Sequence, residues 1–275
     1  MSQIRVNHLT FSYEGSRDTI FEDVSFSIDT DWKLGLIGRN GKGKTTFLKL
    51  LRGEYPYKGS ISTSALFDYF PYEITQEQLQ LPAADFMDHL KSWCELWRVI
   101  CELDLLGEGA DILYRPFGQL SPGERTKILL AVLFSGEQDF LLIDEPTNHL
   151  DQQSREKIKE YLAQKKGFIL VSHDRDLLDA CVDHVLVLNR QTIEVQRGNF
   201  SSWWGNKERR DRFEQAENEK HQKEIAGLKA AAARTENWAV KMKKQKLVLI
   251  PPRSMTGLSA RGRILGPKRK KCRAE

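Results

Sequence analysis

The fold of this chain is decided by the stretch Gly38-Arg39-Asn40-Gly41-Lys42-Gly43-Lys44-Thr45-Thr46. The stretch fits the pattern G-x-x-x-x-G-K-[ST], which gains meaning only between a strand and a helix. The apolar residues 33–37 before it predict a short strand, and residues 46–51 after it predict the start of a helix. Because a chance glycine-rich turn is not expected to have both neighbours, the stretch predicts a phosphate-binding loop.

The residue types in this loop suit the binding of a nucleotide. Glycines let the backbone curl until its N–H groups point at phosphate oxygens, and the N-terminus of the following helix adds a positive dipole end. Lys44 would reach the β- and γ-phosphates, and the hydroxyl of Thr45 would bind Mg²⁺. The loop residues that we assign to ATP binding are Gly38, Asn40, Gly41, Gly43, Lys44, Thr45 and Thr46.

Composition places the chain among ordinary soluble globular proteins, with 40% hydrophobic and 29% charged residues. The longest apolar run, residues 128–134, is far shorter than the ~20 residues of a membrane-spanning helix. The polar N-terminus is unlike a signal peptide, and none of the four cysteines forms a C-x-x-C pair. We therefore expect a cytoplasmic protein with no membrane insertion.

The net charge of +4 hides two oppositely charged regions. Residues 205–275 contain 20 Lys and Arg against 8 Asp and Glu, whereas residues 1–204 contain 22 against 30. This split indicates an acidic body with a basic appendage, and nucleic acid is the partner that we expect for the appendage. A solvated tail without any partner is an equally good interpretation of the basic run 268–271.

A pair of carboxylates follows a second apolar strand. Residues 139–145 end in Asp144 and Glu145 and otherwise look like a buried parallel strand. Asp144 would hold Mg²⁺ directly or through water, and Glu145 would polarise an attacking water. Two acids that merely cap the next turn are the structural alternative.

A capped helix and a histidine complete the set. Ser121 fits an N-cap, Pro122 the first helical position and Glu124 the third. The apolar residues 167–171 predict a strand that delivers His173 to the ligand face of the sheet. There we favour a γ-phosphate contact over a structural role.

Three regions carry weaker signals. Tyr13 alone would more often be core or loop filler, but ahead of a phosphate loop it is placed to stack on a nucleobase. Apolar spacing predicts that residues 76–106 are mainly helical, with aromatic side chains in the core. Residues 207–246 are also predicted to be helical, whereas the basic residues 251–275 have no periodicity and are predicted to be disordered.

Together these motifs resemble those of an ATP-binding cassette (ABC) ATPase, over residues 1–204. The resemblance implies an α/β fold in which a mostly parallel sheet carries the phosphate loop. An antiparallel β subdomain and a helical subdomain at about 73–135 would complete the cassette. A charged linker helix at 205–250 and a disordered basic tail at 251–275 would follow it.

The mechanism of the family is implied motif by motif. Two cassettes sandwich two ATP molecules, so the signature residues Ser121, Gly123 and Glu124 would contact the γ-phosphate held by the other cassette. Tyr13 matches the aromatic residue that stacks on adenine. The other matches are Lys44 in the phosphate loop, the Mg²⁺ ligands Thr45 and Asp144, the catalytic Glu145, the D-loop residue Asp151 and the switch histidine His173.

A narrower resemblance points to the ABC-F class, which has no membrane domain and acts on the ribosome. It is carried by the turn Pro146-Thr147-Asn148-His149-Leu150-Asp151 and by Gly198-Asn199-Phe200-Ser201 before a charged helix. Residues 120–127 and 9–15 look most like ribosomal-protection members, which confer resistance to lincosamides, streptogramin A and pleuromutilins. The resemblance implies contacts with the ribosome, including rRNA and tRNA.

The sequence departs from the family pattern in three places. Pro122 replaces a signature glycine, and Tyr72 stands where most cassettes carry a glutamine that contacts Mg²⁺. A phenol is bulkier and a poorer Mg²⁺ ligand than an amide. Relatives carry a second cassette after the linker, and this sequence has none. We therefore expect a first-half fragment, whose second cassette is a missing C-terminal half or another copy in a homodimer.

Two other functions are compatible with these motifs. A nucleotide-binding subunit of a membrane transporter would explain the cassette, but not the turn at 146–151 together with the charged helix. An ATP-binding fragment without hydrolysis of its own is the other alternative, because the resemblance implies that the signature acts in trans.

Overall fold

The computed structural model describes residues 2–248 apart from 17, 39–40, 42, 92–93, 137–138 and 190–191. The chain divides into two compact units, residues 1–211 and 212–275. The predicted ATP contact of Asn40 and the predicted disorder of the tail 251–275 fall outside the described residues.

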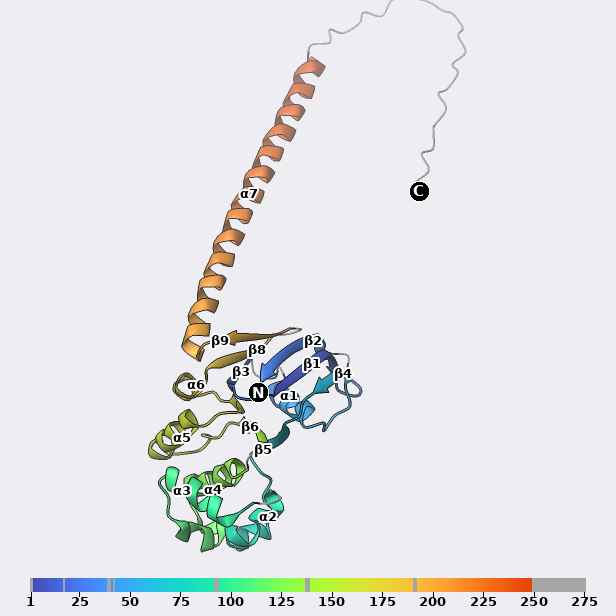
Figure 1. The fold of residues 1–275 in the computed structure, drawn as a ribbon. Helices are drawn as coiled ribbons and strands as arrows, with labels where there is room; N and C mark the ends of the chain where they lie inside the picture. The colour runs from blue at the N-terminus through green and yellow to red at the C-terminus, as the bar shows by residue number, and fades with distance from the viewer. Residues whose placement is uncertain are drawn as a thin grey trace, which may run out of the picture. The chain divides into compact units, whose positions relative to one another are not determined.

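A six-stranded sheet lies at the centre of the first unit (Figure 1). All neighbouring strands are parallel except the last pair. Three inner strands are apolar and buried almost throughout, as parallel strands covered on both faces must be. The strand order is β5 (Leu66–Phe70), β6 (Asp139–Asp144), β7 (Phe168–Val171), β3 (Lys33–Gly38), β8 (His184–Leu188) and β9 (Ile193–Arg197).

The parallel arrangement collects the predicted site residues at one edge of this sheet. β3 ends at Gly38, where the glycine-rich loop begins, and β6 ends at Asp144. β7 lies between these two strands and leads to Ser172 and His173. Because parallel strands have their carboxyl ends at the same edge, the loop, the two acids and the histidine become neighbours.

A separate antiparallel sheet has the order β2-β1-β4. Its strands are β1 (Gln3–Ser12), β2 (Thr19–Asp29) and β4 (Lys58–Ser62). Inward-facing residues such as Ile4 and Val6 share a core cluster with Phe47 and Leu48 of helix α1 (Lys44–Leu51). The antiparallel sheet therefore supports the helix that follows the glycine-rich loop.

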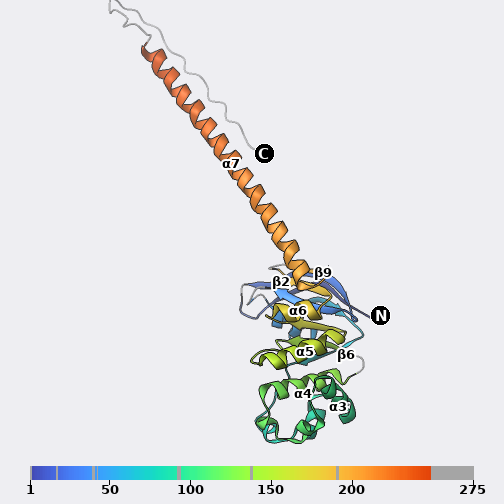
Figure 2. The same cartoon turned by 90° about the vertical axis from the view of Figure 1, so that its left-hand side faces the viewer.

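A helical part is inserted between β5 and β6 along the chain, and Figure 2 shows its helices α3 and α4 together. The prediction that residues 76–106 are mainly helical is correct only in pieces, because the chain is extended at Pro82, Lys91 and Glu95. Pro82 has no N–H to donate and so interrupts a helix. The elements are η1 (Gln78–Gln80), η2 (Ala83–Asp85), α2 (Met87–Leu90), α3 (Leu96–Leu105), η3 (Ala110–Tyr114), η4 (Phe117–Gln119) and α4 (Pro122–Phe134).

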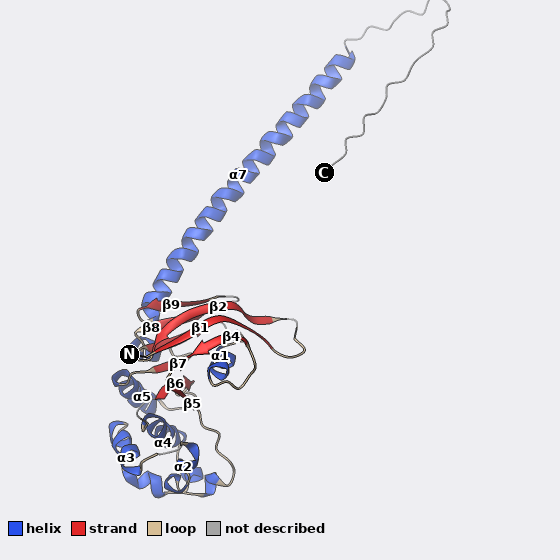
Figure 3. Cartoon of the chain, turned by 45° about the vertical axis from the view of Figure 1, so that its right-hand side comes forward, coloured by secondary structure: helices blue, strands red, loops and turns tan. Residues whose placement is uncertain are grey.

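The remaining helices are α5 (Gln152–Gln164), α6 (Arg175–Cys181) and the long α7 (Phe200–Val248; Figure 3). α7 starts at Phe200 because Asn199 caps it: Oδ1 of Asn199 accepts hydrogen bonds from N and Oγ of Ser202 at 3.1 and 2.7 Å. In its first turn, Phe200 and Trp203 are buried in the first unit. The α/β fold with an antiparallel sheet, a helical part and a long following helix is thus confirmed.

The described part of the second unit, residues 212–248, is a continuous stretch of α7. Its large apolar side chains are exposed, among them Phe213, Ile225, Leu228 and Trp238. Throughout the described ranges, no helix combines the length and the apolar character that crossing a membrane demands.

Candidate nucleotide-binding site

The glycine-rich loop joins β3 to α1, as predicted. Gly43 is the N-cap of α1 with φ of 92°, a conformation that glycine adopts without strain. A Cβ at this position would lie 2.6 Å from Cγ2 of Ile20 on β2. Gly41 also has a positive φ, 73°, but no described atom beyond its neighbours in the chain lies within 4 Å of the place where its Cβ would be. The loop is therefore both curled by its glycines and pressed against the antiparallel sheet.

The three residues that begin α1 each have a polar partner. Nζ of Lys44 donates to the backbone O of Gly38 at 3.3 Å, which holds the side chain across the loop. Oγ1 of Thr45 donates to Oδ2 of Asp144 at 2.9 Å. Hydroxyl and carboxylate oxygens are the ligands that Mg²⁺ prefers. The pair at the meeting point of the loop and β6 therefore fits this cation.

Tyr13 follows β1 and lies beside the start of α1. Its hydroxyl is 2.8 Å from Oγ1 of the buried Thr46. Its ring makes edge contacts with Phe11 and Tyr55 at centroid distances of 5.1 and 5.6 Å. Tyr13 is 40% exposed, so it borders the loop at the surface.

The structure brings Glu145 and His173 together. Glu145 has a φ of 52°, an uncommon conformation for a residue with a Cβ that is often found at functional sites. Its N–H donates to the backbone O of Val171 at 2.9 Å. Oε2 of Glu145 accepts from the backbone N of His173 at 3.3 Å, and Nε2 of His173 lies 3.4 Å from Oε1. The end of β7 thus holds the carboxylate that follows β6.

One oxygen of Glu145 is buried without a hydrogen-bond partner. Among the described residues, nothing forms a hydrogen bond of good geometry with Oε1, and the His173 ring at 3.4 Å is only an ion-pair contact. Burial raises the pKa of the Glu145 carboxyl above its ordinary value of 4.5, although His173 and Lys44 act in the opposite direction. Buried acceptors in proteins are normally hydrogen-bonded, so within the described part of the chain this oxygen is available to a further donor such as a water.

The capping box predicted for α4 is confirmed. Backbone N of Glu124 donates to Oγ of Ser121 at 3.2 Å, and backbone N of Ser121 donates to Oε2 of Glu124 at 2.7 Å. These hydrogen bonds, first that of the Ser121 backbone, hold the pKa of the Glu124 carboxyl below its ordinary value. Glu124 also pairs with Arg115 at 3.2 Å. In the part of the chain that the structure describes, neither signature residue forms a polar contact with the glycine-rich loop.

Gly123 and Asp151 meet at the start of α5. Asp151 is the N-cap of that helix, and the neighbouring Ser154 holds the pKa of the Asp151 carboxyl below its ordinary value. A Cβ on Gly123 would lie 2.5 Å from Oγ of Ser154. Close packing against Ser154 therefore also favours glycine at position 123, which the sequence did not indicate.

Tyr69 is a neighbour of the site that the sequence analysis also missed. Its hydroxyl donates to Oδ2 of Asp144 at 3.3 Å, the same oxygen that Thr45 binds. Burial and the nearby Asp144 raise the pKa of Tyr69 above its ordinary range, so the phenol keeps its proton. The contact exists because β5 pairs with β6, and no local motif signals it.

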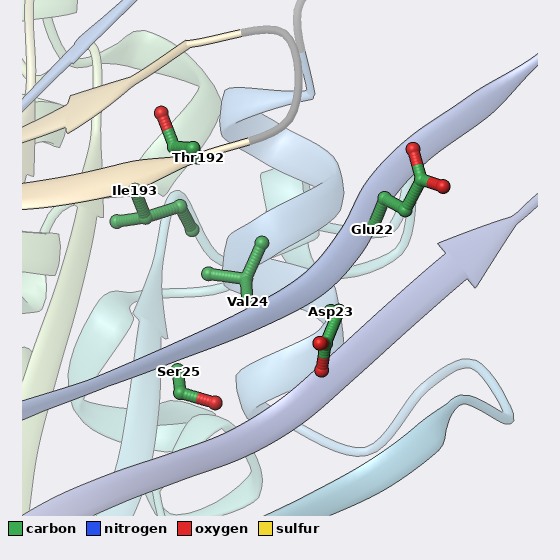
Figure 4. A pocket seen from close by; sticks show the side chains of 6 residues that line it. All are labelled: Glu22, Asp23, Val24, Ser25, Thr192 and Ile193. Carbon is green, nitrogen blue, oxygen red and sulfur yellow. The ribbon is translucent and has the colours of Figure 1, made fainter.

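A separate pocket of about 550 Å³ lies between β2 and the start of β9 (Figure 4). The side chains of Glu22 and Asp23 point to different sides of β2. The lining residues are Glu22, Asp23, Val24, Ser25, Thr192 and Ile193. None of them is a predicted site residue, so this pocket is distinct from the loop and its neighbours.

Replacing Gly43 by Ala should weaken ATP binding at least about tenfold, because strain and collision add. A left-handed alanine costs ~1–2 kcal/mol, and its Cβ would also collide with Ile20 and displace the loop. Gly41→Ala is the matched control, since it carries similar strain without a collision. Titration of a fluorescent ATP analogue measures both affinities. Equal losses in the two variants would contradict the collision argument.

Comparisons with known proteins agree with this arrangement. Residues 21–148 match the family described as ABC transporter, and residues 186–247 match a second model of that description, the linker extension typical of ABC-F proteins. The ribosome protection protein VmlR of Bacillus subtilis (strain 168) is 34% identical over 232 residues, which are 84% of this chain and 40% of VmlR. ATP-binding cassette sub-family F member 2 of Mus musculus is 31% identical over 209 residues, which are 73% of this chain and 33% of that protein.

A third relative, YkpA of Bacillus subtilis (strain 168), described as an uncharacterized ABC transporter ATP-binding protein, is 30% identical over 272 residues. The match covers 84% of this chain and 50% of YkpA. The chain therefore spans half or less of the length of these relatives.

Two solved structures share the fold. An inward-facing putative metal-chelate type ABC transporter has a TM-score of 0.59 at 23% identity, covering 72% of this chain and 84% of that one. The ADP form of MJ1267, an ATP-binding cassette of an ABC transporter, has a TM-score of 0.59 at 16% identity, covering 72% and 92%. These likenesses confirm the predicted cassette fold.

Proposed function

We propose that this chain, which carries an ABC transporter ATP-binding domain and the linker extension typical of ABC-F proteins, hydrolyses ATP and acts on the ribosome. The observation that carries hydrolysis is Oε1 of Glu145, which is buried near Lys44 and has no hydrogen-bond partner among the described residues. In this proposal residues 1–204 are the cassette, with its helical subdomain at about 73–135, and residues 205–250 are the linker.

The glycine-rich loop and its neighbours would bind the nucleotide. Backbone N–H groups of the loop and the ammonium of Lys44 would surround the phosphates, and Tyr13 would stack on the base. Mg²⁺ held by Thr45 and Asp144 would neutralise charge on the phosphates. The hydrogen bond of 2.9 Å between these two side chains supports their joint role as ligands.

Glu145 and His173 would carry the hydrolytic step. Oε1 of Glu145 would accept a hydrogen bond from the attacking water, while the backbone N–H of His173 fixes the other oxygen at 3.3 Å. The His173 side chain is 61% exposed, so its ring is free to contact the γ-phosphate. Alignment of water and phosphate would then supply most of the rate increase.

A second cassette would complete the site. The polar groups of Ser121 and Glu124 bond to each other and to Arg115 rather than to the loop. In Figures 1 and 3, α4 lies with the helical part and α1 beside β4. The signature residues Ser121, Gly123 and Glu124 would therefore face a nucleotide on another cassette, either a second copy of this chain or a cassette on another protein.

The ribosome is proposed as the partner on three grounds. The turn at 146–151 resembles that of ABC-F proteins, the linker extension matches over residues 186–247, and the named relative VmlR is a ribosome protection protein. The basic residues of the appendage suit the phosphates of rRNA and tRNA. We further propose a cytoplasmic location and protection of the ribosome from antibiotics, by analogy with that relative.

Co-sedimentation with ribosomes in the presence of ATP and Mg²⁺ tests this proposal. The wild-type chain should sediment at low salt and be released as salt rises, because phosphate contacts release counterions. Glu145→Gln should remain bound at a salt concentration that releases the wild type. Lys44→Ala, which should not hold ATP, is the matched control and should not be retained.

The outcomes separate the parts of the proposal. If no variant sediments at low salt although ATP is hydrolysed, the ribosomal role is wrong and the ATPase role stands. If binding is independent of ATP in all variants, the cassette does not control the interaction. Restored translation in the presence of a lincosamide would support protection, and unchanged inhibition would contradict it.

A further inference from the structure

A buried cluster of charged side chains connects the α/β core with the helical part. Lys91 follows α2, and its Nζ lies 2.9 Å from Oδ2 of Asp68 and 2.6 Å from Oδ2 of Asp139. The same Nζ donates to the backbone O of Leu133 at 2.6 Å. These three contacts occupy all the donors of an ammonium group. The side chains of Lys91, Asp68 and Asp139 are only 11, 20 and 17% exposed.

Tyr72 closes this cluster. Its hydroxyl donates to Oδ2 of Asp68 at 2.7 Å, the oxygen that Lys91 also binds. Burial and Asp68 raise the pKa of the Tyr72 phenol, so it stays protonated and donates. We call Asp68, Tyr72, Lys91 and Asp139 the joint. Tyr72 stands at the position where most cassettes carry a glutamine that contacts Mg²⁺. Its side-chain hydroxyl is instead bound to Asp68 inside the joint.

The pleat of β5 explains why neighbouring residues serve different sites. Asp68 and Tyr69 are adjacent on this strand, so their side chains point to opposite faces of the sheet. Tyr69 reaches Asp144 at the glycine-rich loop, whereas Asp68 reaches Lys91 of the helical part. Tyr69 and Tyr72 therefore belong to two separate groups of contacts, although they are only three residues apart.

Gly136 lies against the joint, and the ion pair fills the space next to its Cα. A Cβ on Gly136 would collide with Oδ2 of Asp139 and would lie 2.8 Å from Nζ of Lys91. A residue with a side chain at position 136 would have to displace the ion pair. The ion pair therefore occupies the space that a side chain at position 136 would need.

The joint lies between the two elements that carry the proposed chemistry. Asp139 begins β6, whose other end is Asp144. Leu133, whose carbonyl accepts from Lys91, lies near the end of α4, the helix that Ser121 caps. Strand and helix are each stiff, so a fixed contact between them fixes the orientation of the signature relative to the hydrolytic acids.

We propose that Tyr72 and Lys91 are positioning residues that lock the helical part onto the α/β core, and that Tyr72 is not a ligand of the Mg²⁺ of the nucleotide. The consequence for turnover rests on the proposed function. The lock itself is a property of the chain without nucleotide and can be measured alone.

The distance between core and helical part tests the lock directly. Cys101 on α3 is exposed, and Cys94 and Cys181 are buried, so spin labels at Cys101 and at an introduced Lys58→Cys on β4 report this distance, with Cys272 replaced by Ser. Double electron–electron resonance of the full chain should give one narrow distribution of distances between the two spin labels. Tyr72→Phe, which removes a single hydroxyl, should broaden it, and Lys91→Met should broaden it further.

Kinetics of two tyrosine variants separate positioning from metal binding. Tyr72→Phe should lower kcat by about two- to tenfold, as loss of one hydrogen bond implies, with unchanged half-saturation by ATP and Mg²⁺. Tyr69→Phe is the matched variant, because its hydroxyl touches Asp144, and it should raise the Mg²⁺ concentration needed for half-maximal binding of a fluorescent ATP analogue.

A Tyr72→Phe chain with an unchanged, narrow distance distribution would overturn the proposal. So would a shift of its Mg²⁺ dependence like that of Tyr69→Phe. If the wild type fails to hydrolyse ATP, the proposed function is wrong. The distance measurement still shows whether Tyr72 and Lys91 hold the helical part against the core. Tyr72→Phe keeps the aromatic ring and removes no charge, so this variant is expected to fold. Its distance distribution tests the lock even if Lys91→Met does not fold.

Discussion

Glu145→Gln is expected to lower the rate of ATP hydrolysis by about 10²- to 10⁴-fold, the usual contribution of a general base. An amide cannot take a proton from the attacking water, yet it has nearly the same size as the carboxyl group. ATP binding should be kept, because the substitution leaves Lys44 and Thr45 in place. Phosphate release at saturating ATP measures the rate, and titration of a fluorescent ATP analogue measures binding. A variant with more than a tenth of the wild-type rate would show that Glu145 is not the base.

The same substitution should raise the melting temperature at neutral pH. Burial raises the pKa of the Glu145 carboxyl in the folded chain, so the ionised form is less favourable there than in the unfolded chain. This destabilisation is present above the raised pKa and disappears below the ordinary value of 4.5. Glutamine carries no charge at any pH. The difference in melting temperature should therefore shrink as the pH falls towards 4.5, and a difference independent of pH would contradict the assigned cause.

Two inactive variants should restore each other's activity when mixed. Lys44→Ala removes the phosphate contact of the loop, and Ser121→Ala removes the hydroxyl of the signature. In a dimer of the two different chains, the intact loop of one chain faces the intact signature of the other. With random pairing and independent sites, an equal mixture should reach about a quarter of the wild-type rate.

The measurement is phosphate release by each variant alone and by the mixture at the same total concentration. Circular dichroism of Ser121→Ala is the control, because loss of the N-cap costs about 1 kcal/mol and must not unfold α4. A mixture no more active than the average of its components would show that the signature does not act between copies of this chain. In the wild type, activity rising with the square of concentration at low concentration would agree with dimerisation.

Local sequence was sufficient where one segment contains all the residues that act together. Residues 38–51 contain both the glycines of the turn and the helix that follows it. Ser121 and Glu124, three residues apart, form a capping box with each other. The strand that ends in Asp144 was also predictable, because continuous burial of residues 140–143 leaves an apolar run between its two terminal aspartates. The helical part was predicted less well, since 3₁₀ turns and extended residues interrupt an apolar spacing that looks helical.

Contacts between distant segments could not be predicted in this way. Tyr69 meets Asp144 only because β5 lies beside β6 in the sheet, and the family resemblance placed Tyr72 at the glutamine position without showing what its hydroxyl binds. Gly123 looked like a phosphate contact, but the structure also packs it against Ser154. The partners of Tyr69 and Gly123 are dozens of residues away along the chain. Tyr72 binds the nearby Asp68, but Asp68 is held in turn by Lys91 from another element.

The sequence by itself determined the nucleotide loop, the acids after β6, the histidine after β7 and the long charged helix, because each depends on the order of residue types along a short segment. The tertiary structure decided which oxygen of Glu145 is buried without a partner among the described residues, how Tyr13 borders the loop and how Tyr72 and Lys91 join the helical part to the core. These features depend on burial and on strand order, which arise only when the whole chain packs together, since a side chain is desolvated or paired by groups from other segments.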